Sequence, residues 1–141
     1  MESLRATSGV LLLHRASQRA DNLFGQEVGA SLTRSQFEVL LAAKNSPGGT
    51  QTAIMAATGM NRSSVALSVS GLIKKGWLQR RRNQRDRRSN SVRLTASGAA
   101  VLDSAELGAR KADDALFAAL SPTERSRFLG ILTRIVDDQK T

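Results

Sequence analysis

Hydrophobic residues recur at helical spacing along most of the chain, and this pattern predicts a mainly helical protein. The first such segment runs from residue 4 to about residue 29, with polar residues between its apolar positions. Gly29 can end this helix, because glycine readily adopts the left-handed conformation found at helix C-termini. We therefore expect one long amphipathic helix at the N-terminus. Its apolar positions are Leu13, Ala16, Ala20, Leu23, Phe24 and Val28.

Capping residues predict where the next helices begin. Thr33 and Gln36 form a capping-box pattern, in which the threonine hydroxyl accepts the Gln36 amide and the glutamine side chain reaches back. The helix that they open should end before the loop of residues 46–49, which contains a Pro-Gly-Gly run. Thr50 can then cap a short third helix over residues 51–58.

A fourth helix follows after a short turn. Asn61 is a favourable N-cap for it, and the helix should run to about Lys75 before Gly76 stops it. Gly59 lies in the preceding turn, where the chain needs a positive φ. Two helices joined by a short turn that contains glycine form a helix-turn-helix.

The periodicity changes after the fourth helix. Residues 78–82 and 91–94 are short and strand-like, and the polar, arginine-rich loop of residues 83–90 joins them into a hairpin. Thr95 can cap another long helix that extends toward Leu120. We therefore expect a mainly α fold with a small β-hairpin. A final helix opens with Ser121, Pro122 and Glu124 and has apolar residues at Phe128, Leu129, Ile131, Leu132, Ile135 and Val136.

Length and composition exclude several classes of protein. The 141 residues suit one domain, or one domain with helical extensions. The chain has no Cys and one His, so we expect no disulfide, no metal site, no cofactor and no enzyme active site. No apolar run approaches the ~18 residues of a membrane span, and the N-terminus lacks the pattern of a signal peptide. We therefore expect a soluble cytoplasmic protein with no membrane partner.

The positive charge is concentrated in one short segment. The chain carries 21 Lys and Arg against 12 Asp and Glu, a formal net charge of +9. Residues 74–93 hold nine of these basic residues and one acidic residue, Asp86, which gives this segment alone a charge of +8. A charge run by itself is often only a solvated face. Its position directly after a helix-turn-helix instead indicates a binding surface for an anionic partner.

A helix-turn-helix followed by a basic hairpin is the winged-helix arrangement. A helix fits the major groove of DNA, and the hairpin can lay arginines along the backbone or into the minor groove. In its motifs over residues 32–100, and in its order of helices throughout, the chain resembles the MarR family of transcription regulators. The matching residues are Leu32-Thr33 with Gln36-Phe37, Gly59 to Val65, Leu72 to Gly76 with Arg80-Arg81, and Asp86-Arg87-Arg88 followed by Leu94-Thr95-Ala96-Ser97-Gly98.

The resemblance implies that the fourth helix enters the major groove of double-stranded DNA. The spacing of Val65, Val69 and Leu72 turns these residues toward the core. Leu67 stands where many relatives have an arginine, so we expect contacts to phosphates and from the wing to supply most of the affinity. The residues of this helix that we expect to bind DNA are Arg62, Ser63, Ser64, Leu67, Ser68 and Lys74, with Ser70 on the same side.

The resemblance also assigns roles in the wing. It implies that Arg88 enters the minor groove and that Asp86 forms an ion pair that holds the loop. Arg85 and Arg87 are expected to contact phosphates.

The resemblance also implies a homodimer built from the N- and C-terminal helices. The long first and last helices carry more apolar surface than one small winged helix can bury. We expect residues 1–31 to form an N-terminal dimerisation helix, residues 32–95 the DNA-binding lobe, and residues 96–141 the C-terminal dimerisation helices. Two recognition helices would then meet successive major grooves of a pseudo-palindromic operator, about 10 base pairs apart. The alternative is that these helices pack back within one chain.

Related proteins often bind a small aromatic or phenolic acid between the dimer helices and the DNA-binding lobe. The candidate ligand-binding residues are His14, Arg15 and Arg19 on the first helix, with Arg34 at the start of the second. The alternative for the histidine is an ordinary surface or core position. For Arg15 and Arg19 it is a solvated face or a salt bridge within the dimer.

These patterns together predict a dimeric, sequence-specific DNA-binding transcription regulator, a repressor released by a small ligand. One alternative is a DNA-binding protein without an effector, which its own concentration would regulate. Another is a winged helix that associates with RNA. The chain has no Tyr, one Trp and four Phe, so it has few aromatic side chains on which single-stranded bases could stack.

Overall fold

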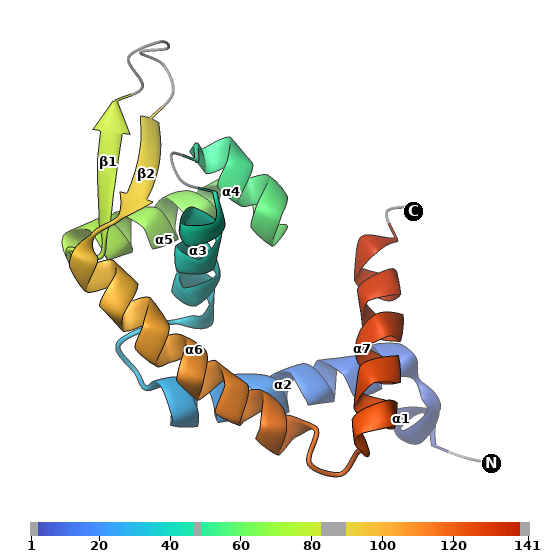
Figure 1. Cartoon of the computed structure of the whole chain (residues 1–141). Coiled ribbons are helices and arrows are strands. Elements are labelled where there is room, and N and C mark those ends of the chain that lie inside the picture. Colours follow the sequence, from blue (N-terminus) through green and yellow to red (C-terminus); the bar gives the residue numbers. More distant parts are fainter. Residues whose placement is uncertain (1–2, 47–48, 83–89, 139–141) are drawn as a thin grey trace.

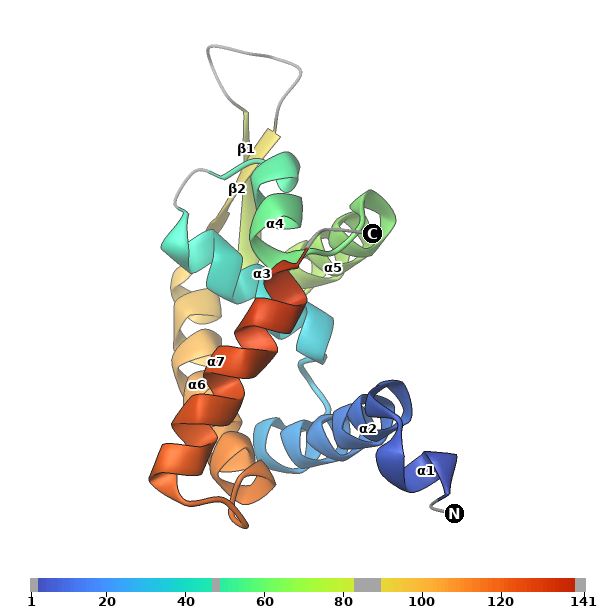
Figure 2. The same ribbon diagram turned by 90° about the vertical axis from the view of Figure 1, so that its right-hand side faces the viewer.

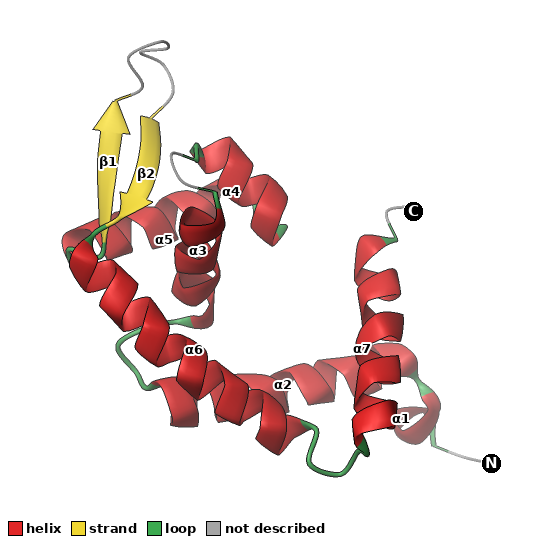
Figure 3. Ribbon diagram, viewed as in Figure 1, coloured by secondary structure: helices red, strands yellow, loops and turns green. Residues whose placement is uncertain are grey.

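The computed structural model describes residues 3–46, 49–82 and 90–138. These residues form seven helices and one antiparallel hairpin, a mainly α fold as predicted (Figures 1 and 3). The helices are α1 (Leu4–Thr7), α2 (Gly9–Val28), α3 (Arg34–Asn45), α4 (Gln51–Thr58), α5 (Arg62–Lys74), α6 (Ala96–Leu116) and α7 (Pro122–Asp137), and the strands are β1 (Leu78–Arg82) and β2 (Asn90–Leu94).

The predicted single N-terminal helix is in fact two helices. Ser8 separates them, because its backbone is extended and its hydroxyl accepts a hydrogen bond from the Leu11 amide at 3.4 Å. Serine is a favourable N-cap, so this local bond competes with a continuous helix. The predicted end of α2 is confirmed, since Gly29 follows it with a φ of 96°.

The predicted caps of the later helices are confirmed. At the start of α3 the Thr33 hydroxyl accepts the Gln36 amide and the Gln36 side chain accepts the Thr33 amide, both at 3.1 Å. Ser121 and Glu124 form the same reciprocal pair at the start of α7. Single side chains cap the three helices between α3 and α7, namely Thr50 for α4, Asn61 for α5 and Thr95 for α6.

The hydrophobic core lies in the winged-helix lobe. Helices α3, α4 and α5 pack against one another, and the hairpin and the first part of α6 close the lobe. Completely buried apolar side chains give such a lobe most of its stability, roughly 1.5–3 kcal/mol each before the entropy of ordering is subtracted. The most deeply buried are Val39, Leu40, Ile54, Val65, Val69, Leu72, Val92 and Leu102.

The remaining helices extend away from this lobe. Helix α6 leads from the hairpin to the far end of the molecule, where it packs against α2 (Figure 1). Gly108 permits this close crossing, because a Cβ there would lie 2.6 Å from the carbonyl oxygen of Glu27. Helix α7 stands apart from the lobe in Figure 1 and passes in front of it in the turned view of Figure 2. Neither α2 nor α7 contains a buried residue. No helix in the described part of the chain has the length and hydropathy of a membrane span.

Candidate nucleic-acid interface

Local hydrogen bonds hold the turn between α4 and α5. The Thr58 hydroxyl donates to the Ile54 carbonyl at 2.7 Å and accepts the Met60 amide at 3.2 Å. Gly59 ends α4 in the left-handed conformation with a φ of 72°, and its amide bonds to Met55. Asn61 then caps α5 by accepting the Ser64 amide at 2.8 Å. This arrangement is the predicted helix-turn-helix.

Helix α5 has one buried side and one exposed side. Val65, Val69 and Leu72 have no exposed area and fix the helix on α3 and α4. Ser64 is half-buried at one edge. On the opposite side, Leu67 is 78% exposed, which leaves an apolar side chain in the middle of a polar surface. The exposed side chains are Arg62, Ser63, Leu67, Ser70 and Lys74.

The prediction that Ser68 is available to DNA is wrong. This residue is only 7% exposed and lies on the same side of α5 as Val65 and Leu72. It follows Ser64 by one turn, but Ser68 lies deeper in the lobe, so the two serines are not equivalent. The surface that α5 offers to a partner is therefore narrower than the sequence predicts.

The hairpin forms a two-stranded wing beside α5. Its register pairs Leu78 with Leu94 and Arg80 with Val92, and Leu78 and Val92 are buried against the lobe. The predicted start of β2 is one residue late, because Asn90 also pairs. Arg81 and Arg93 are exposed, as is Arg80. The tip of the wing, with Arg85, Asp86, Arg87 and Arg88, lies outside the described residues, so its predicted roles stay predictions.

Thr95 and Gly98 fix the base of the wing. The Thr95 hydroxyl donates to the Gly76 carbonyl at 2.6 Å and accepts the Gly98 amide at 3.0 Å, which joins the end of the hairpin to its beginning. A Cβ at Gly98 would lie 2.0 Å from the Trp77 carbonyl oxygen, so only glycine fits without movement of the backbone. The Leu-Thr-x-x-Gly motif is thus the closure of the wing onto α6.

The lobe carries nearly unopposed positive charge. Residues 39–102 contain eleven Lys and Arg and a single acidic residue, Asp86. Among the side chains that the structure describes, five basic ones of α5 and the strands take part in no ion pair, whereas the ion pairs lie on α2, α3, α6 and α7. These five, which are exposed and could contact phosphates, are Arg62, Lys74, Arg80, Arg81 and Arg93.

Lys75 connects the end of α5 to the segment between α2 and α3. Its ammonium group donates to the carbonyl of Ser31 and to the side chain of Gln36, and it lies 5.0 Å from the centre of the Trp77 ring. Gln36 also caps α3, so one side chain takes part in both contacts. Local sequence patterns could not predict these two hydrogen bonds, because Lys75 lies 44 residues from Ser31 and 39 residues from Gln36.

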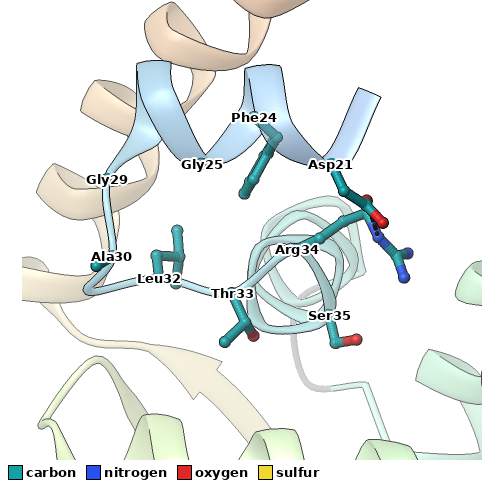
Figure 4. Close-up of a pocket in the computed structure, with 9 residues that line it drawn as sticks. All are labelled: Asp21, Phe24, Gly25, Gly29, Ala30, Leu32, Thr33, Arg34 and Ser35. Atoms are coloured by element: carbon teal, nitrogen blue, oxygen red, sulfur yellow. Dashed lines mark ion pairs between the residues drawn. The ribbon is translucent and has the colours of Figure 1, made fainter. Parts of the chain in front are cut away.

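A pocket of about 400 Å³ lies between the end of α2 and the start of α3 (Figure 4). Phe24 forms its apolar side and lies beside Phe37, with ring centres 5.4 Å apart and ring planes tilted by 57°. Arg34 also lines the pocket, and its guanidinium pairs with the carboxylates of Asp21 at 3.3 Å and Glu38 at 3.1 Å. The residues that line it are Asp21, Phe24, Gly25, Gly29, Ala30, Leu32, Thr33, Arg34 and Ser35.

Only one of the four candidate ligand-binding residues lines this pocket. Arg34 does so, whereas His14, Arg15 and Arg19 lie on exposed parts of α2 outside it. Asp21 and Phe24 were missed by the sequence analysis, because a pocket residue on an amphipathic helix has no pattern of its own. Another pocket, of about 440 Å³ and mostly apolar, lies where α2, α6 and α7 meet and includes Leu13 and Phe128.

Comparison with known proteins identifies the family. A family model described as MarR family matches residues 30–89, which include the helix-turn-helix and the first strand of the hairpin. The chain is 30% identical over 130 residues to the HTH-type transcriptional repressor NicR of Pseudomonas putida, a match that spans 92% of this chain and 82% of NicR. The chain belongs to the MarR family. It is a winged-helix, DNA-binding transcription regulator.

Solved structures of MarR-family regulators have the same fold. The PcaV transcriptional regulator of Streptomyces coelicolor, in complex with its natural ligand, superposes with a TM-score of 0.92 at 28% identity, over 99% of this chain and 100% of PcaV. The transcriptional repressor CouR, bound to a 23-mer DNA duplex, gives a TM-score of 0.88 at 31% identity, over 95% and 96% of the two chains.

Proposed function

We propose that this MarR-family protein is a homodimeric repressor that binds a pseudo-palindromic operator and is released by a small aromatic acid. It acts by binding and not by catalysis, and it works in the cytoplasm, where such operators are found. The observation that carries the proposal is the exposed side of α5, which lies beside a basic wing with no described acidic side chain paired to either.

In this proposal the exposed side of α5 lies in the major groove. Arg62 at its start and Lys74 at its end bind phosphates, and Ser63 and Ser64 bond to a base or to the backbone. Arg85 and Arg87 bind phosphates from the wing, and Arg88 enters the minor groove. The DNA-bound structure of CouR supports this geometry, because its fold matches this chain over nearly the whole length.

The dimer is formed by the terminal helices. Residues 1–31 and 96–141 supply it and residues 32–95 bind DNA. Exposed apolar side chains support this division, because a monomer would leave them in water. On α2 they are Val10, Leu11, Leu12 and Leu13, and on α7 and just before it they are Leu120, Phe128, Leu129, Ile131, Ile135 and Val136.

Electrophoretic or anisotropy titration with double-stranded DNA tests the DNA-binding part. The expected result is submicromolar binding of an operator duplex with a steep fall in affinity as salt rises, since each neutralised phosphate releases a counterion. Unlabelled RNA of the same sequence serves as competitor. Preferential binding of the RNA would contradict the proposal and favour the RNA-associated alternative.

The effector part needs its own measurement. The pocket at Arg34 has an aromatic wall and a guanidinium, which suits an aromatic carboxylate that takes the place of Asp21. A panel of aromatic and phenolic acids is screened by thermal shift, where a ligand at 100 times its Kd adds about 2.7 kcal/mol to the unfolding free energy. A ligand that stabilises the protein and releases DNA supports the proposal. If no acid in the panel does either, the alternative without an effector replaces it.

A further inference from the structure

Leu67 is the one large apolar side chain on the exposed side of α5. It is 78% exposed, whereas the other leucine of this helix, Leu72, is completely buried. A single exposed leucine is ordinary on a protein surface, so exposure alone argues nothing. The position is what matters. Leu67 lies in the middle of the exposed side, one turn after Ser63 and nearly one turn before Ser70.

Between the two ends of α5, Leu67 is the longest of the exposed side chains. Serine side chains are short, and Ala66 beside it is shorter still. The long side chains of this surface, Arg62 and Lys74, lie at the two ends of the helix. When α5 enters the groove, Leu67 is therefore the group that meets the base edges at the centre of the contact.

A leucine side chain has no hydrogen-bonding group. If it packs against the donors and acceptors of guanine, cytosine or adenine, it displaces their bound water and makes no hydrogen bond in its place, which is unfavourable. The C5-methyl group of thymine is the one apolar feature on the major-groove edge of the bases. A leucine at the centre of the contact thus favours thymine and disfavours a base that presents a polar group there.

Resting on the proposed DNA-binding function, we infer that Leu67 selects thymine at one position in each operator half-site by packing against its C5-methyl group. The basic side chains around α5 hold the helix in the groove without choosing a base. Leu67 is then a specificity-determining residue whose partner is a methyl group and not a hydrogen-bonding edge.

Thymine and deoxyuridine differ only in this methyl group, which gives a direct test. The probe is the tightest-binding duplex recovered from a random 24-base-pair pool, remade with each thymine replaced in turn by deoxyuridine. Wild-type protein should lose about fourfold in affinity at one thymine of each half-site, the value expected for one buried methyl group. Substitution of both symmetry-related thymines should lose about fifteenfold if the two half-sites act independently.

Variants assign the effect to the side chain. Leu67→Ala should bind the thymine and deoxyuridine duplexes with equal affinity, because the group that senses the methyl is gone. Ser70→Ala, on the same exposed side, should keep the fourfold preference for thymine. Both variants should retain the unfolding transition of the wild type, because neither side chain is buried.

The outcomes separate this inference from the function on which it rests. If no duplex is enriched from the pool, the proposed DNA-binding function and the methyl contact are both contradicted. If a duplex binds specifically but no deoxyuridine substitution changes affinity by more than twofold, only the methyl contact is overturned. The contact is also overturned if Leu67→Ala still distinguishes thymine from deoxyuridine, or if that variant alters self-association and not DNA binding.

Discussion

At the scale of single residues, two glycines let segments of main chain come into direct contact. Gly98 lies against the carbonyl of Trp77 at the base of the wing, and Gly108 lies against the carbonyl of Glu27 where α2 crosses α6. Neither glycine has a positive φ, so the requirement is space and not backbone conformation. These two contacts bring the base of the wing close to α6 and bring α2 close to α6.

Gly98→Ala should therefore destabilise the protein. Its Cβ would lie 2.0 Å from the Trp77 oxygen, and relief of the clash requires the wing base to move away from α6. We expect a loss of about 1–3 kcal/mol in the free energy of unfolding, measured by urea denaturation. Ser97→Ala, at an exposed position in the same turn, is the control and should change stability by less than about 0.5 kcal/mol. Equal stabilities for the two variants would contradict the contact.

Arg88→Ala tests the wing. If this arginine occupies the minor groove, its loss should weaken binding to all sequences and lower the slope of log K against log salt by about one phosphate contact. Arg110→Ala is the matched control, since Arg110 lies on α6 and pairs with Glu106. An affinity and a salt slope that both equal the wild-type values would remove Arg88 from the interface.

What the sequence reveals about residues depends on how local their environment is. Asn61 and Thr95 were predicted as caps correctly, because a cap depends on three or four neighbouring residues. Ser68 was placed wrongly, since its burial depends on how α5 rotates against α3 and α4. Lys75 and Asp21 were missed for the same reason: their partners are distant in the chain.

At the scale of elements, too, features that depend on neighbouring residues could be predicted and features that depend on tertiary packing could not. The starts of α3 to α7 follow from caps and the hairpin follows from its alternating pattern, so the winged helix could be predicted almost residue by residue. The break at Ser8 was missed, because the prediction followed the apolar positions from Leu13 onward and did not use the N-cap that Ser8 offers between Thr7 and Gly9. Helix α7 was predicted correctly as an element, but its separation from the lobe (Figure 1) is a property of the tertiary structure.

The start of α7 makes a prediction about pH. The Ser121 backbone amide, and then its hydroxyl hydrogen bond, lower the pKa of Glu124 below its ordinary value of 4.5. A lowered pKa in the folded state means that the capping box stabilises α7 above pH 4.5 and stops doing so as pH falls through the folded value. Carboxyl NMR should give Glu124 a pKa below 4.5. Ser121→Ala should raise that pKa part of the way back, since the backbone bond remains.

A pKa of Glu124 that is unchanged in Ser121→Ala would show that the hydroxyl does not contribute.

Removal of residues 121–141 should convert the dimer to a monomer that binds DNA weakly. Helix α7 contains no buried residue and does not contribute to the core of the lobe, so the lobe should still fold, whereas the exposed apolar residues of α7 are lost. Sedimentation equilibrium gives the mass, and circular dichroism verifies that the other helices persist. Ile131→Glu/Ile135→Glu tests the same surface in the full chain, since both side chains are about half exposed. A tight-binding dimer without this segment would contradict the assignment.

At the scale of the whole molecule, charge and apolar surface are segregated. Residues 39–102 contain eleven basic residues and one acidic residue, while the rest of the chain contains ten basic and eleven acidic ones. The large exposed apolar residues of the described chain follow the opposite distribution and, apart from Leu67, lie outside this segment. One end of the molecule is thus suited to phosphates and the other to a second copy of the chain.

Lys75 and the pocket at Arg34 lie between these two ends. The lysine bonds to Ser31, and the pocket is lined by the residues on either side of it, Ala30 and Leu32. A ligand that displaces this connection would therefore act on the end of α5 through few intermediates. This placement gives a proposed effector a physical route to the DNA-binding surface.

The central claim is that two copies of α5 read one DNA duplex, and selection from a random double-stranded pool tests it most directly. The account predicts recovery of a pseudo-palindrome whose half-site centres lie about 10 base pairs apart, bound by two protein chains. Hydroxyl-radical footprinting of the recovered duplex should then show two protected patches at that spacing. Recovery of no sequence, or of a single half-site bound by one chain, would contradict it.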